Sequence, residues 1–140
     1  MKTVAKKIMS IAIALTMTSC AVGNEEALRA SDSPLAIRSH QSRQFEVRDE
    51  NLMMRAVIAT LQDFDFVLDN LEPDMGAVTA TMLDGQRLRM TVIVKGQGER
   101  SFHVRASAQS GNTAIETPEF YQTFFTGLQK SLFLDDHGID

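Results

Sequence analysis

Residues 88–108 read LRMTVIVKGQGERSFHVRASA, and this stretch decides the fold class. Apolar residues occupy every second position on both sides of a Gly-Gln-Gly turn at residues 96–98. Successive side chains of a strand point to opposite faces, so this alternation predicts two strands that are each apolar on one face. The short turn predicts an antiparallel pair. The positions predicted to face the core are Leu88, Met90, Val92, Val94, Phe102, Val104, Ala106 and Ala108.

Shorter runs that alternate apolar and polar residues lie on both sides of this hairpin, and they predict further strands. These runs are residues 43–47, 64–69 and 78–82, with a weaker candidate at 113–116. Turn-forming residues separate them: Pro73 and Gly76 lie in one predicted turn, and residues 84–86 form a compact hairpin loop.

Two segments have the apolar spacing of amphipathic helices. The first, residues 50–63, follows Asp49, whose carboxylate can cap a helix. The second runs from Thr117, a candidate N-cap, to Leu134 and carries five of the nine aromatic residues. The apolar positions of the first are Met53, Met54, Val57, Ile58, Leu61 and Phe64, and those of the second are Phe120, Tyr121, Phe124, Phe125, Leu128 and Leu132.

Together these elements predict an α+β fold. We expect one antiparallel sheet of about four to six strands, with two helices packed on one face, in the order strand, helix, strands, helix. A single domain is expected to span residues 43–134. Its Phe, Met and Leu side chains are expected to form a plain core with little room for a pocket.

The start of the chain has the pattern of an export signal. Three lysines precede an apolar run of about ten residues, which is too short for a helix that crosses a bilayer. Residues 16–20, Thr-Met-Thr-Ser-Cys, then resemble the lipobox of bacterial lipoproteins. That resemblance implies a signal peptide at residues 1–19, cleavage before Cys20 and a diacylglycerol on its sulfur. By the same resemblance, Ala21 implies the periplasmic face of the outer membrane.

Two segments are expected to flank the domain. Residues 20–42 are rich in Ala, Ser, Arg and acidic residues without a helical or strand period, which predicts a flexible tether. Residues 135–140 are predicted to form a polar tail. Removal of the signal takes away three of the 14 basic residues and none of the 18 acidic ones, which leaves a net charge of −7. This balance argues against nucleic-acid binding.

One face of the predicted sheet collects basic residues. If Lys95 pairs with Glu99 across the turn, Arg89 lies opposite Arg105, and the preceding hairpin places Thr81 opposite Arg89. The residues expected to share the face away from the helices are Arg87, Arg89, His103 and Arg105. Two interpretations remain open. The arginines can cover the sheet with their stems while their charges stay in water, or the face can dock an acidic partner, peptide or anionic glycan.

Residues 55–64, 76–81 and 118–133 carry a resemblance to a group of small, poorly characterised proteobacterial lipoproteins. More loosely, the element order is similar to that of the helix-grip domains in the C component of the outer-membrane β-barrel assembly machinery, and to small modules of secretin-type rings. The resemblance implies a fold and supplies no catalytic residue.

The sequence contains no recognisable catalytic or metal-binding pattern. His40, His103 and His137 lie in separate predicted segments without paired carboxylates or thiols, and Cys20 is the only cysteine. We therefore expect a non-catalytic accessory protein, without cofactor or metal, that docks onto an envelope protein complex. The alternative is a binding module for a small apolar ligand or a cell-wall fragment.

Overall fold

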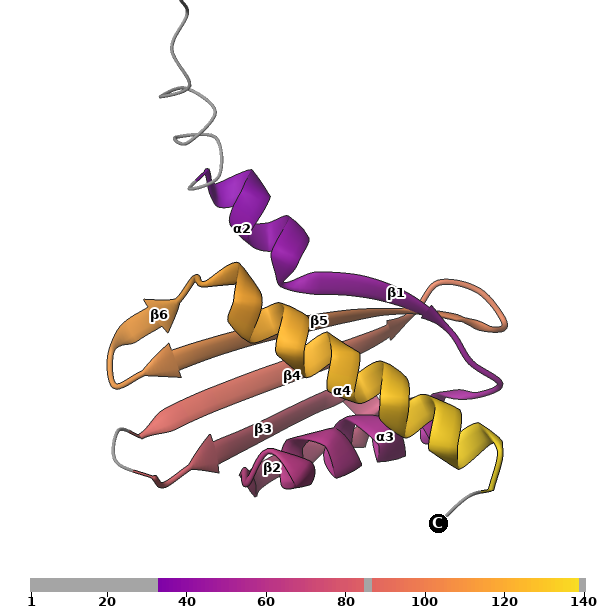
Figure 1. Cartoon of the computed structure of the whole chain (residues 1–140). Helices are drawn as coiled ribbons and strands as arrows, with labels where there is room; N and C mark the ends of the chain where they lie inside the picture. The colour runs from indigo at the N-terminus through magenta and orange to yellow at the C-terminus, as the bar shows by residue number, and fades with distance from the viewer. Residues whose placement is uncertain (1–32, 85–86, 139–140) are drawn as a thin grey trace, which may run out of the picture.

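The computed structural model describes residues 33–84 and 87–138, and within them it shows an antiparallel sheet with three α-helices (Figure 1). The predicted α+β class is therefore confirmed. The elements are α2 (Pro34–His40), β1 (Ser42–Glu46), α3 (Glu50–Asp63), β2 (Val67–Glu72), β3 (Ala77–Met82), β4 (Leu88–Gly96), β5 (Ser101–Ser110), β6 (Thr113–Ile115) and α4 (Pro118–Asp136), with a 3₁₀ turn at Pro73–Met75. The strands lie in the order β1-β5-β4-β3-β2, and β6 also pairs with β5.

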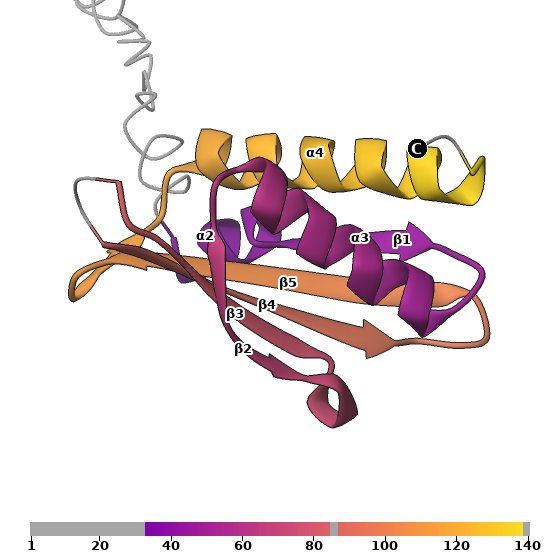
Figure 2. The same ribbon diagram turned by 90° about the horizontal axis from the view of Figure 1, so that it is seen from below.

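The core lies between the sheet and the long helices. Figure 2 shows α3 and α4 on the same side of the sheet. The apolar strand residues that were predicted to face the core point to that side. Val92, for example, lies opposite Val78 on β3 and Ala106 on β5, and all three are buried. The largest fully buried side chains from the helices are Leu52, Met53, Val57, Leu61, Tyr121, Phe125 and Leu128.

Helix α3 has the bounds that its sequence predicts. The Asp49 Oδ1 atom accepts a hydrogen bond of 2.8 Å from the Leu52 N–H, which satisfies one free donor of the first turn. That hydrogen bond, together with the positive charge of Arg48, holds the pKa of the Asp49 carboxyl below its ordinary value. Thr117 occupies the N-cap position of α4 as predicted, but its side chain makes no capping hydrogen bond.

The helices α3 and α4 run antiparallel and meet along a short line of contacts. Arg55 forms an ion pair of 3.5 Å with Asp135, and the Thr60 hydroxyl lies 3.0 Å from that of Ser131. Gly127 then faces Phe64, where an added Cβ would lie only 2.9 Å from a ring carbon. Because α3 ends at Asp63, the first two turns of α4 extend beyond it.

The predicted pairing of β4 with β5 is wrong by four positions. Lys95 lies opposite His103 instead of Glu99, and Arg89 lies opposite Gln109 instead of Arg105. The strands close at Gly96 and Phe102, so the connecting loop is longer than the three residues assumed. A shift by an even number leaves every side chain on its predicted face. The other predicted pair, Thr81 with Arg89, is confirmed.

The predicted tether and tail also differ from the structure. Residues 34–40 form α2, whose first turn is capped by the Ser33 hydroxyl, and Ser42 already belongs to β1. At the other end, α4 continues to Asp136 instead of stopping at Leu134. The remaining residues of the predicted tether, 20–32, lie outside the described residues.

Candidate functional site

The face of the sheet that points away from α3 and α4 is mostly polar, although Ile93 and Val67 also lie on it. It consists of the side chains that alternate with the core positions, and those of the central strands include Thr79, Thr91, Ser107 and Gln109. The Thr79 and Thr91 hydroxyls lie 3.4 Å apart across the β3–β4 pair. Figure 2 shows this side of the sheet without a covering helix among the described elements.

Charged side chains of both signs lie on this face, with Arg89, Lys95 and Arg105 on the central strands. The carboxylates of Glu46, Asp69 and Glu72 lie on the outer strands β1 and β2. Arg89 on β4 lies between Thr81 and Gln109, and Arg105 on β5 lies between Ile93 and Ser42. Lys95 and His103 are directly opposite each other. The two arginines are therefore not cross-strand neighbours, so the repulsion expected between them is absent.

The four residues predicted for this face do not all belong to a strand. Arg89, His103 and Arg105 do, and they share the face away from the core. Arg87 precedes β4, and its carbonyl oxygen accepts a hydrogen bond from the Gly111 N–H. The ion pairs found within residues 33–84 and 87–138 join Arg48 to Asp49 and Arg55 to Asp135, away from this face.

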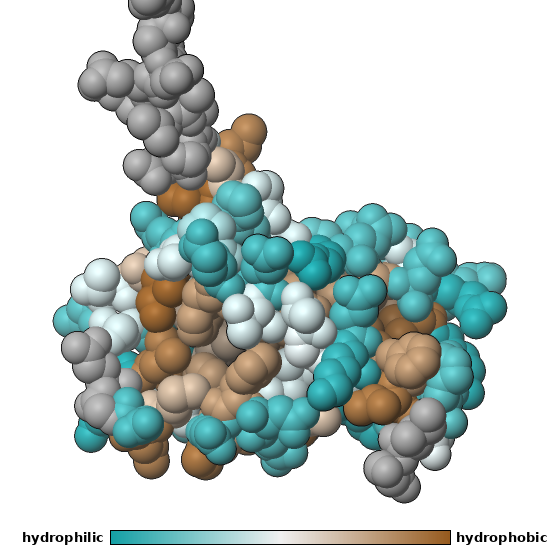
Figure 3. All heavy atoms as spheres, viewed as in Figure 1, coloured by the Kyte–Doolittle hydropathy of each residue, from teal (hydrophilic) through white to brown (hydrophobic). Residues whose placement is uncertain are grey.

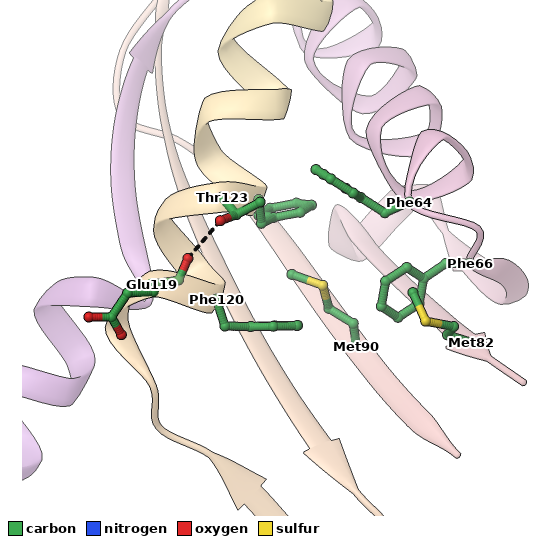
Figure 4. A pocket seen from close by; sticks show the side chains of 8 residues that line it. Phe64, Phe66, Met82, Met90, Glu119, Phe120 and Thr123 are labelled. Atoms are coloured by element: carbon green, nitrogen blue, oxygen red, sulfur yellow. Dashed lines mark hydrogen bonds between the residues drawn. The ribbon is translucent and has the colours of Figure 1, made fainter. Parts of the chain in front are cut away.

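A cavity of about 280 Å³ opens between the start of α4 and the sheet, where α3 has ended. The prediction of a core with little room for a pocket is wrong at this place. Figure 4 shows the apolar side chains of the lining grouped around a gap. The lining residues are Phe64, Phe66, Met82, Met90, Glu119, Phe120, Thr123 and Phe124.

The polar groups of this cavity are few. The Thr123 hydroxyl donates a hydrogen bond of 2.9 Å to the Glu119 carbonyl oxygen, and the Glu119 carboxylate points away from the apolar side chains (Figure 4). No lining residue is a lysine, arginine or histidine. On the helix side of the molecule, Figure 3 shows hydrophobic residues reaching the surface beside the first turns of α4.

A buried tyrosine joins the end of α2 to the rest of the domain. The Tyr121 hydroxyl accepts hydrogen bonds from the Gln41 side chain and the Ala108 N–H, both 3.1 Å long, and donates to the Ile115 carbonyl oxygen. Tyr121 is fully buried and Gln41 nearly so. This network links four segments, so its role is structural. The sequence pattern does not reveal it, because Gln41 falls in a polar stretch.

The remaining candidates do not form a site within the described residues. His40 ends α2, and His137 follows α4, where its ring stacks on Phe133. Across residues 33–84 and 87–138, no three His, Cys, Asp or Glu side chains group as metal ligands would. None of the helices described there combines the length and apolar character needed to cross a bilayer. Cys20, the predicted lipidation site, lies outside the described residues.

No protein-family model matches the chain, and no curated protein matches it significantly.

Proposed function

We propose that this protein is a lipid-anchored accessory protein of the bacterial envelope, which carries out no catalysis and docks its domain onto an envelope protein assembly. The lipobox-like residues before Cys20 support the anchor, and Ala21 supports its placement on the periplasmic face of the outer membrane. The observation that carries the docking proposal is the uncovered sheet face with Arg89, Lys95, His103 and Arg105, which lacks ion pairs among the described residues.

The charge distribution favours an acidic protein partner. Single exposed ion pairs contribute only about 0–1 kcal/mol each, so the dispersed cations Arg89, Lys95 and Arg105 act mainly on orientation and association rate. The mature chain has a net charge of −7, so it repels an acidic partner in general. The central strands β4 and β5 of this face carry cations, while its carboxylates lie on the outer strands, so the centre of the face attracts such a partner. The row of Thr, Ser and Gln side chains supplies hydrogen-bonding groups at the same surface.

The docking proposal is tested by reversing charge on the sheet face. Arg89→Glu combined with Arg105→Glu should abolish recovery of a specific partner after crosslinking in intact cells and mass spectrometry. Arg38→Glu combined with Lys130→Glu changes the net charge equally at exposed positions on α2 and α4, and it should retain the partner. Equal recovery with both double variants, each with wild-type circular dichroism, contradicts docking through this face.

The anchor is tested separately at Cys20. Cells fed radiolabelled palmitate should transfer label to the wild-type protein and not to Cys20→Ala. Label that remains on Cys20→Ala rules out the lipid attachment proposed for this cysteine.

A second candidate function, binding of a small apolar ligand or cell-wall fragment, is favoured by the cavity beside Phe120. Of these two ligands, the apolar lining favours the first, because a sugar or peptide fragment would leave its polar groups unpaired there.

A further inference from the structure

We infer that this cavity binds one uncharged hydrocarbon chain, such as the alkyl end of a neutral lipid, and discriminates against a fatty-acid anion of the same length. The inference rests on the second candidate function, and it names the ligand class and the residues that select it.

The size of the cavity suits one slender chain. An apolar cavity of about 150 Å³ can hold a benzene molecule, and drug-sized ligands occupy about 300–1,000 Å³. With about 280 Å³ the cavity lies between these cases. One water-sized group fills about 30 Å³, so a chain of roughly nine or ten methylene-sized groups fits.

The lining suits a flexible apolar chain. Phe64, Phe66 and Phe120 supply rigid aromatic walls from the α3–β2 connection and from α4. Met82 and Met90 lie on adjacent strands, and the unbranched, polarizable side chain of methionine adapts to irregular apolar surfaces. Because such groups pair with no polar ligand atom, the affinity must come from burial of hydrocarbon.

The charges at the cavity argue against an anionic head group. Sites for carboxylates present a cation or a set of hydrogen-bond donors, but the lining contains no cationic side chain. The first turn of a helix favours a negative charge. In α4 that turn already contains Glu119, and the Thr123 hydroxyl is engaged by the Glu119 carbonyl oxygen. A carboxylate at the mouth would therefore gain no partner among the lining side chains, and Glu119 already supplies the negative charge that the first turn of α4 favours.

The inference is tested with a pair of ten-carbon ligands on the mature chain, residues 20–140, carrying Cys20→Ser. 1-Decanol and decanoate differ in the head group, and each is titrated at pH 8 against N-phenyl-1-naphthylamine bound to the protein. We expect decanol to displace this fluorescent probe at a concentration on the order of tenfold lower than decanoate. Equal displacement by the two ligands overturns the head-group inference and leaves apolar binding intact.

Two pairs of variants locate the binding. Thr123→Phe places a ring in the cavity and should abolish decanol binding, whereas Gln129→Phe adds the same ring at an exposed position of α4 outside the lining and should not. Glu119→Lys should improve decanoate binding about threefold, and Glu116→Lys, which makes the same charge change outside the lining, should have less effect. If neither ligand displaces the probe, or if Thr123→Phe binds decanol like wild type, the cavity is not the binding site and the second candidate function fails with it.

Discussion

The two halves of α4 pack differently, and the difference explains why the molecule has a cavity. The C-terminal half lies against α3, and the contacts run from Asp135 with Arg55 to Gly127 with Phe64. The N-terminal half extends beyond the end of α3. Its sheet-facing side chains Tyr121 and Phe125 are still buried, but on the side where α3 is missing only side chains from the α3–β2 connection reach it. A sheet covered by two helices of unequal length thus has one closed half and one half that opens to solvent. The closed half is packed against α3 along its length, whereas the open half borders the cavity for which a ligand is proposed.

The largest test of this contrast compares truncation of one apolar residue in each half. Leu128→Ala removes a fully buried side chain from the closed half and should lower the free energy of unfolding by about 3 kcal/mol. Phe120→Ala removes a half-buried ring beside the existing cavity and should cost about 1 kcal/mol, because little new void is created. Urea denaturation measures both. Equal losses would show that the two halves are packed equally well.

A smaller loss of stability is expected when the hydroxyl of Tyr121 is removed. This hydroxyl bonds the N-terminal end of α4 to the rest of the domain. Tyr121→Phe leaves the ring in place and removes the partner of the Ala108 N–H and the Gln41 side chain. Buried polar groups without partners should lower the free energy of unfolding by about 2 kcal/mol. Thr126→Ala, which removes an exposed hydroxyl of the same helix, is the matched control and should change stability by less than about 0.5 kcal/mol. Similar values for the two variants would contradict a structural role of the Tyr121 network.

The closed half is the part of the fold that its sequence predicts well. Regular alternation places Val92, Val104 and Ala106 on the buried face, and a strong cap at Asp49 sets the start of α3. The buried face and the helix start depend on local spacing, so both predictions are correct although the predicted β4–β5 pairing is wrong by four residues. The length of the β4–β5 loop, which causes this error, cannot be predicted from the alternation. A shift of the strand register by an even number of residues leaves every side chain on the same face of the sheet, so the alternation fits several loop lengths equally well.

The open half could not be predicted in the same way. Phe64, Met90 and Phe120 each have the spacing of core residues, and each does face the interior. The void arises because α3 ends opposite the middle of α4, and that relation depends on how the helices are placed in space. Helix α2 was missed for a different reason: it spans seven residues and buries none of them, so it has no apolar period. Its only local signals are Ser33 and Pro34, at the cap and the first turn.

A third test changes the contact between Gly127 and Phe64, which marks the boundary between the two halves of α4. Gly127→Ala adds a methyl group that would lie 2.9 Å from the Phe64 ring and 3.3 Å from the Thr60 methyl carbon. Alanine favours the helix by about 1 kcal/mol over glycine, whereas displacement of the ring costs a similar amount. The net stability should therefore change by less than about 1 kcal/mol. Because Phe64 lines the cavity, open space lies beside its ring; we expect the ring to tilt into that space, so decanol binding should weaken. Unchanged binding would indicate that Phe64 yields in another direction and that the boundary does not control the cavity.

The smallest expected effect concerns the end of α3 far from the cavity. The pKa of Asp49 is held below its ordinary value of 3.8, mainly by the hydrogen bond from the Leu52 N–H. A group whose pKa is lower in the folded state stabilises that state above its unfolded pKa, and the contribution is lost as the pH falls through the folded pKa. Asp49→Asn keeps a side-chain oxygen that can cap the helix and cannot titrate. At neutral pH the two proteins should therefore have nearly equal stability, and below about pH 3.8 the wild type should lose stability relative to the variant. Urea denaturation between about pH 2.5 and 7 measures the difference in stability. If the wild type becomes more stable relative to the variant as the pH falls, this account of the cap is wrong.

Because Asp49 is remote from the cavity, decanol binding should be the same in the wild type and in Asp49→Asn. Asp49→Asn therefore serves as the control for the Gly127→Ala variant at the opposite end of the α3–α4 interface.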